Sequence, residues 1–175
     1  MTNRQVLPPG IFGSNRTMVT PHYAVMPPEG ILESRLPGLA NTRIHFHTSP
    51  AMGAGFAQAL LVVAEDGGTE GPWNDGLEHF FFVIEGEGEF AAGADARTLT
   101  PGGFVYVAAG CSWRLRAAGG TLRAIWIKRP YIAAAGIAPR ASFFGRRDAV
   151  PRVEKHTKGR AWQMLLGEAD LAMDM

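Results

Sequence analysis

Short runs of apolar residues recur along most of the chain and predict β-strands, because Gly, Pro, Asn and Asp separate them at short intervals. The runs lie at residues 17–26, 43–48, 56–65, 78–85, 88–92, 96–99, 104–107, 112–117 and 122–128. No segment before Pro130 repeats its apolar residues with a helical period. The unbroken run at 80–84 is typical of a strand covered on both faces. This pattern predicts an all-β sandwich or barrel.

The pattern changes after residue 130. Residues 140–160 contain seven basic and two acidic residues, a local charge of +5, although the whole chain carries only +1. Aromatic residues are sparse there, which favours a solvated connector over a nucleic-acid or membrane patch. Residues 161–166 predict a further strand, and 171–175 alternate apolar and acidic residues like a strand that needs a partner. We therefore expect an arm at 1–14, a barrel at 15–130 and an appendage at 131–175.

Composition narrows the range of functions. A chain of 175 residues with 46% hydrophobic residues can form one domain with an appendage. Its net charge of +1 gives no basic field for nucleic acid. The longest uncharged apolar stretch, at 53–64, is too short to span a bilayer. The start has Arg4 but no apolar core after it, and a single Cys forms no internal disulfide, so we expect a cytoplasmic location.

Two tracts, at residues 78–88 and 99–116, resemble the two motifs of the cupins. The resemblance implies a double-stranded β-helix barrel of the jelly-roll type. Metal-binding cupins carry a His-x-His pair, a Glu and a later His in these motifs. Here the Glu position falls on His79 and the later His on Trp113. The His-x-His positions fall on Pro72 and Asn74, or on Trp73 and Asp75.

The remaining metal candidates are therefore His79 with Asp75 or Glu78. Two such ligands hold a metal weakly, because firm sites need three or four. We expect no metal and no other cofactor in this chain, and no catalytic residue. The alternative to a metal ligand is that His79 is a hydrogen-bonded histidine with a structural role. His79, Trp113, Tyr106 and Trp126, with Trp73, either line a pocket for a planar ligand or fill the barrel interior.

Three other features have the residue types of a metal site, a nucleophile or a phosphate-binding loop. His45 and His47 share one face of a predicted strand, but they lie about thirty residues before Glu78, so we interpret them as an exposed strand face. Cys111 has no accompanying motif and is interpreted as a small half-buried filler. The tracts 86–88 and 101–103 are predicted hairpin turns with positive φ, since no phosphate-loop Lys follows.

A more specific resemblance extends over nearly the whole chain. The segments that carry it lie at residues 15–22, 36–41, 49–56, 76–78, 128–131 and 136–139. Together they resemble the (S)-ureidoglycine aminohydrolases, two-barrel cupins of purine and allantoin catabolism. In that family the second barrel holds manganese through a Glu-x-His-x3-His tract and a later Gln. This chain has no such tract, so the resemblance implies the metal-free N-terminal half plus a connector, with 171–175 beginning an uncompleted second cupin.

The resemblance implies hydrolysis of (S)-ureidoglycine to ureidoglycolate and ammonia, with a metal as Lewis acid. We expect this chain to be the non-catalytic half, which needs a second cupin domain or subunit as partner. The alternative is a stand-alone, metal-free cupin that binds a ligand or dimerises. A third hypothesis is a weak metal enzyme built on His79 and Asp75. We also expect a homo-oligomer formed through sheet edges, and neither nucleic acid nor membrane as partner.

Overall fold

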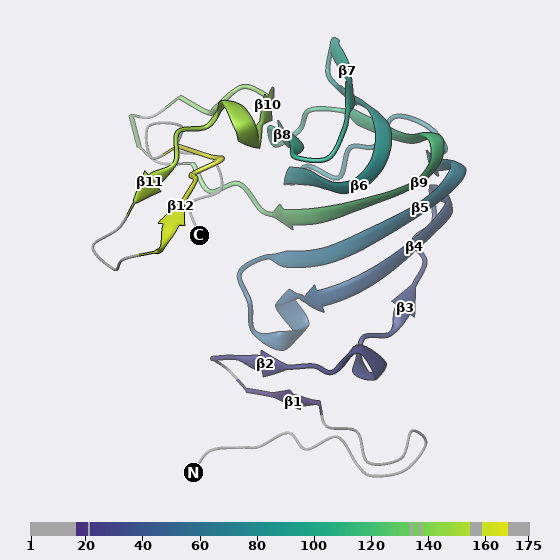
Figure 1. Ribbon diagram of the computed structural model, residues 1–175, viewed down its shortest axis with the longest axis vertical. Coiled ribbons are helices and arrows are strands. Elements are labelled where there is room, and N and C mark those ends of the chain that lie inside the picture. The colour runs from purple at the N-terminus through teal and green to yellow at the C-terminus, as the bar shows by residue number, and fades with distance from the viewer. Residues whose placement is uncertain (1–16, 21, 134, 137, 155–158, 168–175) are drawn as a thin grey trace.

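The computed structural model describes residues 17–167 except 21, 134, 137 and 155–158. The predicted arm at 1–14 and the predicted strand at 171–175 lie outside the described residues. Within them, the helical segments are the three short 3-10 turns η1 (Pro28–Gly30), η2 (Pro50–Met52) and η3 (Arg147–Ala149), and the rest of the regular structure is β (Figure 1). No helix in this part of the chain is long and apolar enough to cross a membrane. The all-β prediction is confirmed.

An antiparallel sheet of eight strands, counted over the described residues, forms the body of the fold. Its strands run in the order β10-β8-β6-β9-β5-β4-β3, and β7 pairs with β6. The strands are β3 (Glu33–Ser34), β4 (Leu39–Thr48), β5 (Ala57–Thr69), β6 (Glu78–Ala92), β7 (Asp95–Leu99), β8 (Gly103–Val107), β9 (Trp113–Arg129) and β10 (Phe143–Arg146). Two small hairpins accompany it: β1 (Met18–Val19) with β2 (Ala24–Val25), and β11 (Val153–Glu154) with β12 (Ala161–Trp162).

Strands β6 and β9 belong to both layers of the barrel. The first half of β6 pairs with β8 and with the end of β9, while its second half pairs with β7 and with the start of β9. The sheet curls between these halves (Figure 1), so that side chains from both halves meet in one interior cluster. The sequence predicts two separate strands in each case, and the structure corrects this. Gly86 has φ 74°, as expected, but it lies in an irregularity of β6 and not in a hairpin turn.

Gly86 is required by both conformation and space. A Cβ there would collide with the carbonyl oxygen of Thr121 and lie 3.2 Å from the Cα of Leu122. Gly119, in the matching bend of β9, has φ 68° but open space around a Cβ. Positive φ strains a non-glycine residue at either position, but of the two only Gly86 adds a backbone clash.

We expect Gly86→Ala to lower the free energy of unfolding by about 3 kcal/mol and Gly119→Ala by about 1 kcal/mol, because only the first substitution adds overpacking to the strain. Urea denaturation of the two variants measures the difference. Equal losses would show that the close approach of β6 to β9 at this bend is not tight.

Other strand boundaries also differ from the predicted ones. The turn signal after residue 65 does not end β5, which continues to Thr69 through Asp66 at φ 59° and an irregularity between Val63 and Gly68. The predicted strand at 17–26 is a small hairpin, β1 with β2. The predicted strand at 161–166 is reduced to the two residues of β12. The turn at 101–103 is present, with Gly102 at φ 85°, but it is not the predicted hairpin turn, because β7 and β8 each pair with β6 and not with each other.

The basic segment is not a solvated connector throughout. Its strand β10 pairs with β8 and so extends the main sheet. Residues 143–154 and 159–166 are named the C-terminal cap here, and side chains from both parts lie on the outer face of β6 and β8. Cap side chains pack there against the aromatic residues of the two strands: Phe143, Val150, Leu165 and Leu166 against Phe80, Phe104 and Tyr106. The apolar residues of the cap therefore hold it against the sheet, although the charge of this segment alone predicts that it is exposed.

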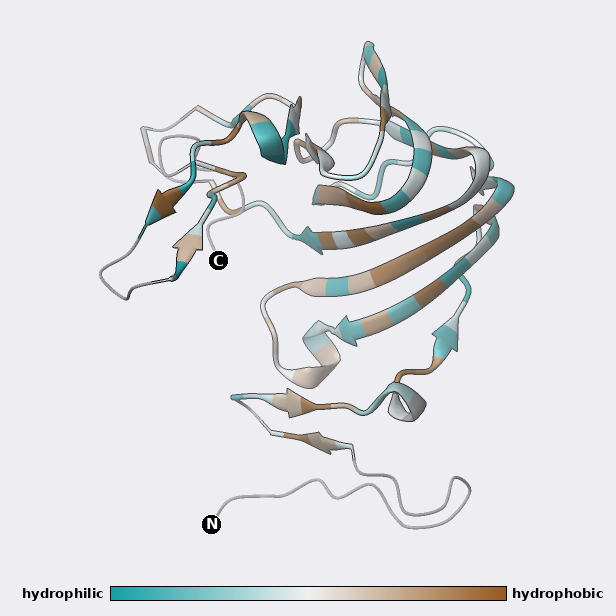
Figure 2. Cartoon of the chain, viewed as in Figure 1, coloured by the Kyte–Doolittle hydropathy of each residue, from teal (hydrophilic) through white to brown (hydrophobic). Residues whose placement is uncertain are grey.

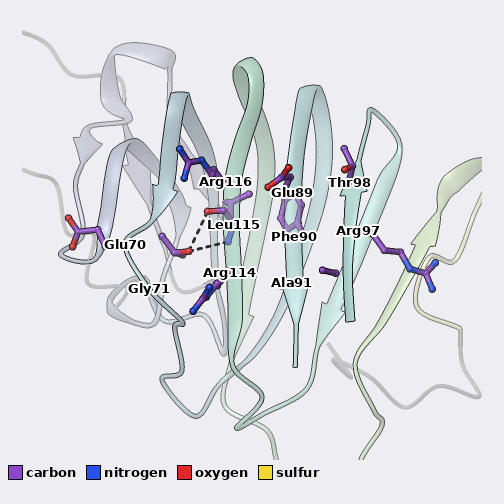
Figure 3. Close-up of a pocket in the computed structure, with 12 residues that line it drawn as sticks. Glu70, Gly71, Glu89, Phe90, Ala91, Arg97, Thr98, Arg114, Leu115 and Arg116 are labelled. Atoms are coloured by element: carbon purple, nitrogen blue, oxygen red, sulfur yellow. Dashed lines mark hydrogen bonds between the residues drawn. The ribbon is translucent and has the colours of Figure 1, made fainter. Parts of the chain in front are cut away.

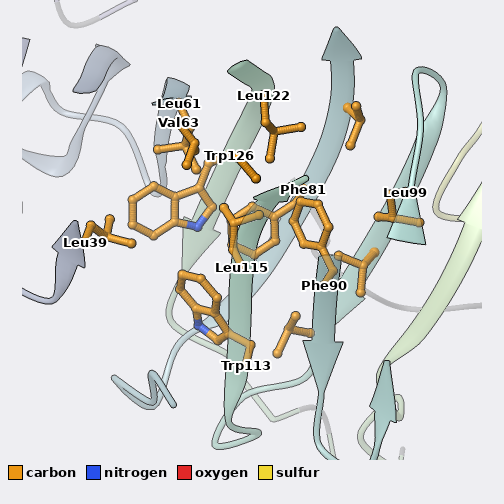
Figure 4. Close-up of a cluster of buried hydrophobic side chains, with 14 of the residues drawn as sticks. Leu39, Leu61, Val63, Phe81, Phe90, Leu99, Trp113, Leu115, Leu122 and Trp126 are labelled. Carbon is orange, nitrogen blue, oxygen red and sulfur yellow. The ribbon is translucent and has the colours of Figure 1, made fainter. Parts of the chain in front are cut away.

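The barrel interior is filled by apolar side chains from both layers (Figure 4). Phe81 and Val83 point inward from β6, and Phe80 points outward beneath the cap. The prediction that this run is covered on both faces is thus confirmed for 80–83, whereas Ile84 is 45% exposed. His79, Trp113 and Trp126, which the sequence singles out either for a pocket or for packing, are buried in this interior.

Candidate functional site

His79 stands at the start of β6 and points into the barrel, where its residue surface is 1% exposed. The indole Nε1 of Trp126 donates a hydrogen bond to His79 Nδ1 at 3.1 Å. An indole nitrogen can only donate, so Nδ1 is the acceptor and the ring proton is on Nε2. His79 Nε2 then donates to Asp75 Oδ1 at 2.9 Å. Both ring nitrogens of His79 are therefore committed within the protein.

Burial fixes the charge state of this pair. Burial lowers the pKa of His79 to about 4, against the opposing charge of Asp75, so the imidazole is neutral at pH 7. Burial alone would raise the pKa of Asp75, but His79, the Leu77 N–H and Lys128 together hold that pKa below its usual value. Lys128 Nζ lies 3.5 Å from Asp75 Oδ2 and 4.8 Å from the ring centre of Trp126. The ionised Asp75 carboxylate is thus shared between a neutral histidine and a lysine.

Aromatic rings fill the space around His79. Its ring centre lies 5.3 Å from that of Trp113 and 5.9 Å from that of Trp126. Trp73 in turn stacks on Trp113 with ring centres 5.7 Å apart. By the resemblance to the cupin motif, Trp113 stands at the position of the later metal-binding His, and Trp73 stands at a His-x-His position in one of the two possible alignments. In this chain those positions pack against each other, which favours the prediction that they fill the interior.

Glu78 points away from His79, because successive residues of a strand face opposite sides. It is 2% exposed on the outer face of β6, under the cap. The Tyr106 hydroxyl donates to Glu78 Oε2 at 2.9 Å, and Arg129 Nε lies 3.4 Å from Oε1. Burial and the hydrogen bond to Glu78 both raise the pKa of Tyr106 well above its usual value. These three residues make a buried structural network that closes the sheet under the cap.

This placement corrects two expectations. Glu78 does not accompany His79 as a metal candidate, and Tyr106 does not share an interior pocket with His79, Trp113 and Trp126. Asp75 and His79 are brought together as predicted for a pair. No local pattern points to Lys128, because its contact with Asp75 depends on the pairing of β9 with β6.

The residues around His79 do not fit a bound metal. Manganese needs several oxygen or nitrogen ligands with available lone pairs. Asp75 is the carboxylate that the structure brings to His79, and the one acceptor nitrogen of His79 already accepts from Trp126. Within the described residues no group of three or more His, Cys, Asp or Glu is placed to hold a metal ion. The geometry therefore offers no step that passes through a metal here.

The other sequence candidates lie apart from this site. His45 and His47 border a groove on the outer face of β4 and β5, and His47 Nδ1 lies 3.2 Å from Gln58 Nε2. Burial and the neighbouring His45 lower the pKa of His47. Cys111 is half-buried, with its Sγ 3.6 Å from the carbonyl oxygen of Ser112. None of these three residues contacts the His79 pair in the structure.

A hollow of about 550 Å³ opens on the outer face of β6, β7 and β9 (Figure 3). Its lining includes the charged residues Glu70, Glu89, Arg114 and Arg116. The sequence does not single it out, because alternating charges on β6 and β9 are typical of any solvated strand face. It contains none of the residues predicted for the site.

Comparison with known proteins agrees with this fold. A model of the cupin domain matches residues 60–128. The chain is 30% identical over 131 residues to (S)-ureidoglycine aminohydrolase of Escherichia coli K12, a match that covers 72% of this chain and 49% of that protein. The crystal structure of protein YlbA from E. coli is similar with a TM-score of 0.73 and 25% identity, over 80% of this chain and 59% of that one.

A second solved structure shows the same fold. A protein of Pseudomonas aeruginosa described as glyoxylate-induced matches with a TM-score of 0.72 and 24% identity, over 90% of this chain and 61% of that one. The chain thus spans about half the length of the curated relative that it matches.

Proposed function

Starting from a chain that carries a cupin domain, we propose that it acts as the non-catalytic N-terminal half of an (S)-ureidoglycine aminohydrolase. The relative from E. coli bears that name and matches most of this chain. The observation that carries the proposal is the state of His79. It takes the place of the cupin Glu ligand, and both of its nitrogens are used by Trp126 and Asp75.

In this proposal the barrel is a packed support for a second cupin, supplied by a further domain or subunit. The second cupin holds manganese and releases ammonia from ureidoglycine, as the family resemblance implies. Trp113 supports this division of labour, because it fills the position of the later His ligand of the cupin motif. Trp73, which stands at a His-x-His position in one of the two alignments, stacks on it. The chain would then take part in purine breakdown in the cytoplasm.

A direct assay tests the absence of catalysis. The purified chain with manganese and freshly prepared (S)-ureidoglycine is expected to release ammonia at least roughly 100-fold more slowly than the E. coli enzyme, because no Lewis acid is positioned. Ammonia is followed continuously, and metal content is measured by mass spectrometry. Release at the rate of the E. coli enzyme, or one firmly bound metal per chain that is lost in His79→Gln, would overturn the proposal.

A chimera separates a half-enzyme from a stand-alone binding module. This chain replaces the matched region of the E. coli enzyme, whose own remaining part is kept. A supporting half is expected to leave manganese-dependent ammonia release in place. If the chimera binds manganese but releases no ammonia, the stand-alone module is the better description.

A further inference from the structure

The hollow on the outer face of β6, β7 and β9 has two small side chains in its lining (Figure 3). In the strand pairing, Ala91 of β6 lies between Ala96 of β7 and Arg114 of β9. The next row on the same face consists of Thr98, Glu89 and Arg116. In Figure 2 hydrophilic bands alternate with paler ones along the curled part of β6, as expected for a strand with one face in solvent. The hollow therefore combines two alanines with charged side chains beside them.

Arg114 and Glu89 border the hollow with no partner in the part of the chain that the structure describes. Neither side chain makes a hydrogen bond or an ion pair with another described residue. Arg116, directly opposite Glu89, instead has its Nη2 3.4 Å from Asp66 Oδ1. Glu89 and Arg114 occupy diagonal positions of β6 and β9, so their Cβ atoms are about 7 Å apart. A negative and a positive side chain are therefore close together, and both are available to a ligand.

These two charges favour a ligand that carries both signs. A guanidinium group donates two parallel hydrogen bonds to a carboxylate, and a glutamate carboxylate accepts hydrogen bonds from an ammonium group. A ligand with an anionic group alone would be repelled by Glu89, and one with a cationic group alone would be repelled by Arg114. In an α-amino acid both charged groups are bonded to one carbon atom, which a side chain on β6 and another on β9 can approach from two sides.

We propose that this hollow binds a free α-amino acid with an apolar side chain. The carboxylate of the ligand pairs with Arg114, its ammonium group pairs with Glu89, and its side chain lies over Ala91 and Ala96. The volume of the hollow, about 550 Å³, lies within the range of small-molecule pockets, roughly 300–1,000 Å³. The site is on the outer face, whereas His79 points into the barrel, so this inference goes beyond the proposed support of an aminohydrolase and does not depend on it.

Two-dimensional NMR of the isotope-labelled full chain, titrated with L-leucine, tests the site. We expect saturable shifts of the amide signals of Ala91, Ala96 and Arg114, with a dissociation constant of about 1 mM or below. Two probes of similar shape each lack one charge: 4-methylpentanoate has no ammonium group, and L-leucinamide has no carboxylate. Each is expected to bind at least roughly tenfold more weakly than L-leucine, because it leaves one charged side chain of the hollow unpaired.

Glu89→Gln and Arg114→Gln each remove one charge from an exposed side chain, so the circular dichroism spectrum should not change. Each variant is expected to bind L-leucine at least roughly tenfold more weakly. In Glu89→Gln the affinity for 4-methylpentanoate should rise to that for L-leucine, because the repelling carboxylate is gone. Arg43→Gln, at an exposed arginine of β4 outside the hollow, is the matched control and should bind L-leucine like the wild type.

Three results would overturn the proposal. The first is the absence of saturable shifts in the hollow with L-leucine up to about 10 mM. The second is equal binding of L-leucine, 4-methylpentanoate and L-leucinamide to the wild type. The third is unchanged binding of L-leucine in both Glu89→Gln and Arg114→Gln.

Discussion

Phe81→Ala is expected to lower the free energy of unfolding by about 4 kcal/mol, the loss typical of a large side chain removed from a packed core. Phe81 is fully buried, and its ring centre lies 4.9 Å from that of Trp113 and 5.6 Å from that of Phe90. Alanine would leave a cavity at the point where the two layers of the barrel meet (Figure 4).

Urea denaturation followed by tryptophan fluorescence measures this loss. Ile84→Ala on the same strand is the control, and because Ile84 is 45% exposed it should cost less than about 1 kcal/mol. The comparison also bears on function. If Phe81→Ala costs no more than Ile84→Ala, the interior is loosely packed and could accommodate a planar ligand. The full loss supports an interior that is already filled by its own aromatic rings.

Between pH 7.5 and pH 5 the protein is expected to lose about 2 kcal/mol of its free energy of unfolding through His79. The pKa of His79 is about 4 in the folded chain and 6.5 without burial. Below pH 6.5 the unfolded chain binds a proton that the folded chain does not. Stability is therefore present above pH 6.5 and is lost as the pH falls towards 4.

His79→Gln removes the titration but keeps a donor and an acceptor, so its stability should change much less over this range. A smaller slope remains from His47, whose pKa is also lowered. His22→Gln, at an exposed histidine outside the His79 pair, is the matched control for the substitution itself. Urea denaturation at several pH values provides the measurement. An unchanged slope in His79→Gln would show that this histidine is not held neutral.

The sequence predicts the strands well because apolar runs and turn residues are local signals. It does not predict how those strands continue. Gly86 needs positive φ in a hairpin turn and in a strand irregularity alike, and only the pairing of β6 with β9 decides between them. Likewise, the many charges at residues 140–160 predict exposure and do not indicate that Phe143 is packed. Its partners Tyr106 and Phe104 are distant in sequence.

The candidate site is predicted in part for the same reason. Matching the cupin motif brings out His79 and Trp113 as interior positions, and the short distance along the chain makes Asp75 a natural partner of His79. The strand predicted at 78–85 implies that Glu78 and His79 face opposite sides, but it does not tell which of them faces the interior, because a run that is apolar on both faces gives no inside and outside. The hydrogen bond from Trp126 to His79 needs the register between β6 and β9, which no local pattern specifies.

The passage of β6 and β9 through both layers ties the layers into a single folding unit. A strand that supplies half of each layer cannot leave one layer without straining the other. We therefore expect local unfolding in the elements that do not pair with these two strands, such as the hairpins β1–β2 and β11–β12. A binding site in the interior would consequently be gained or lost through substitution of interior side chains, and not through separation of the two layers.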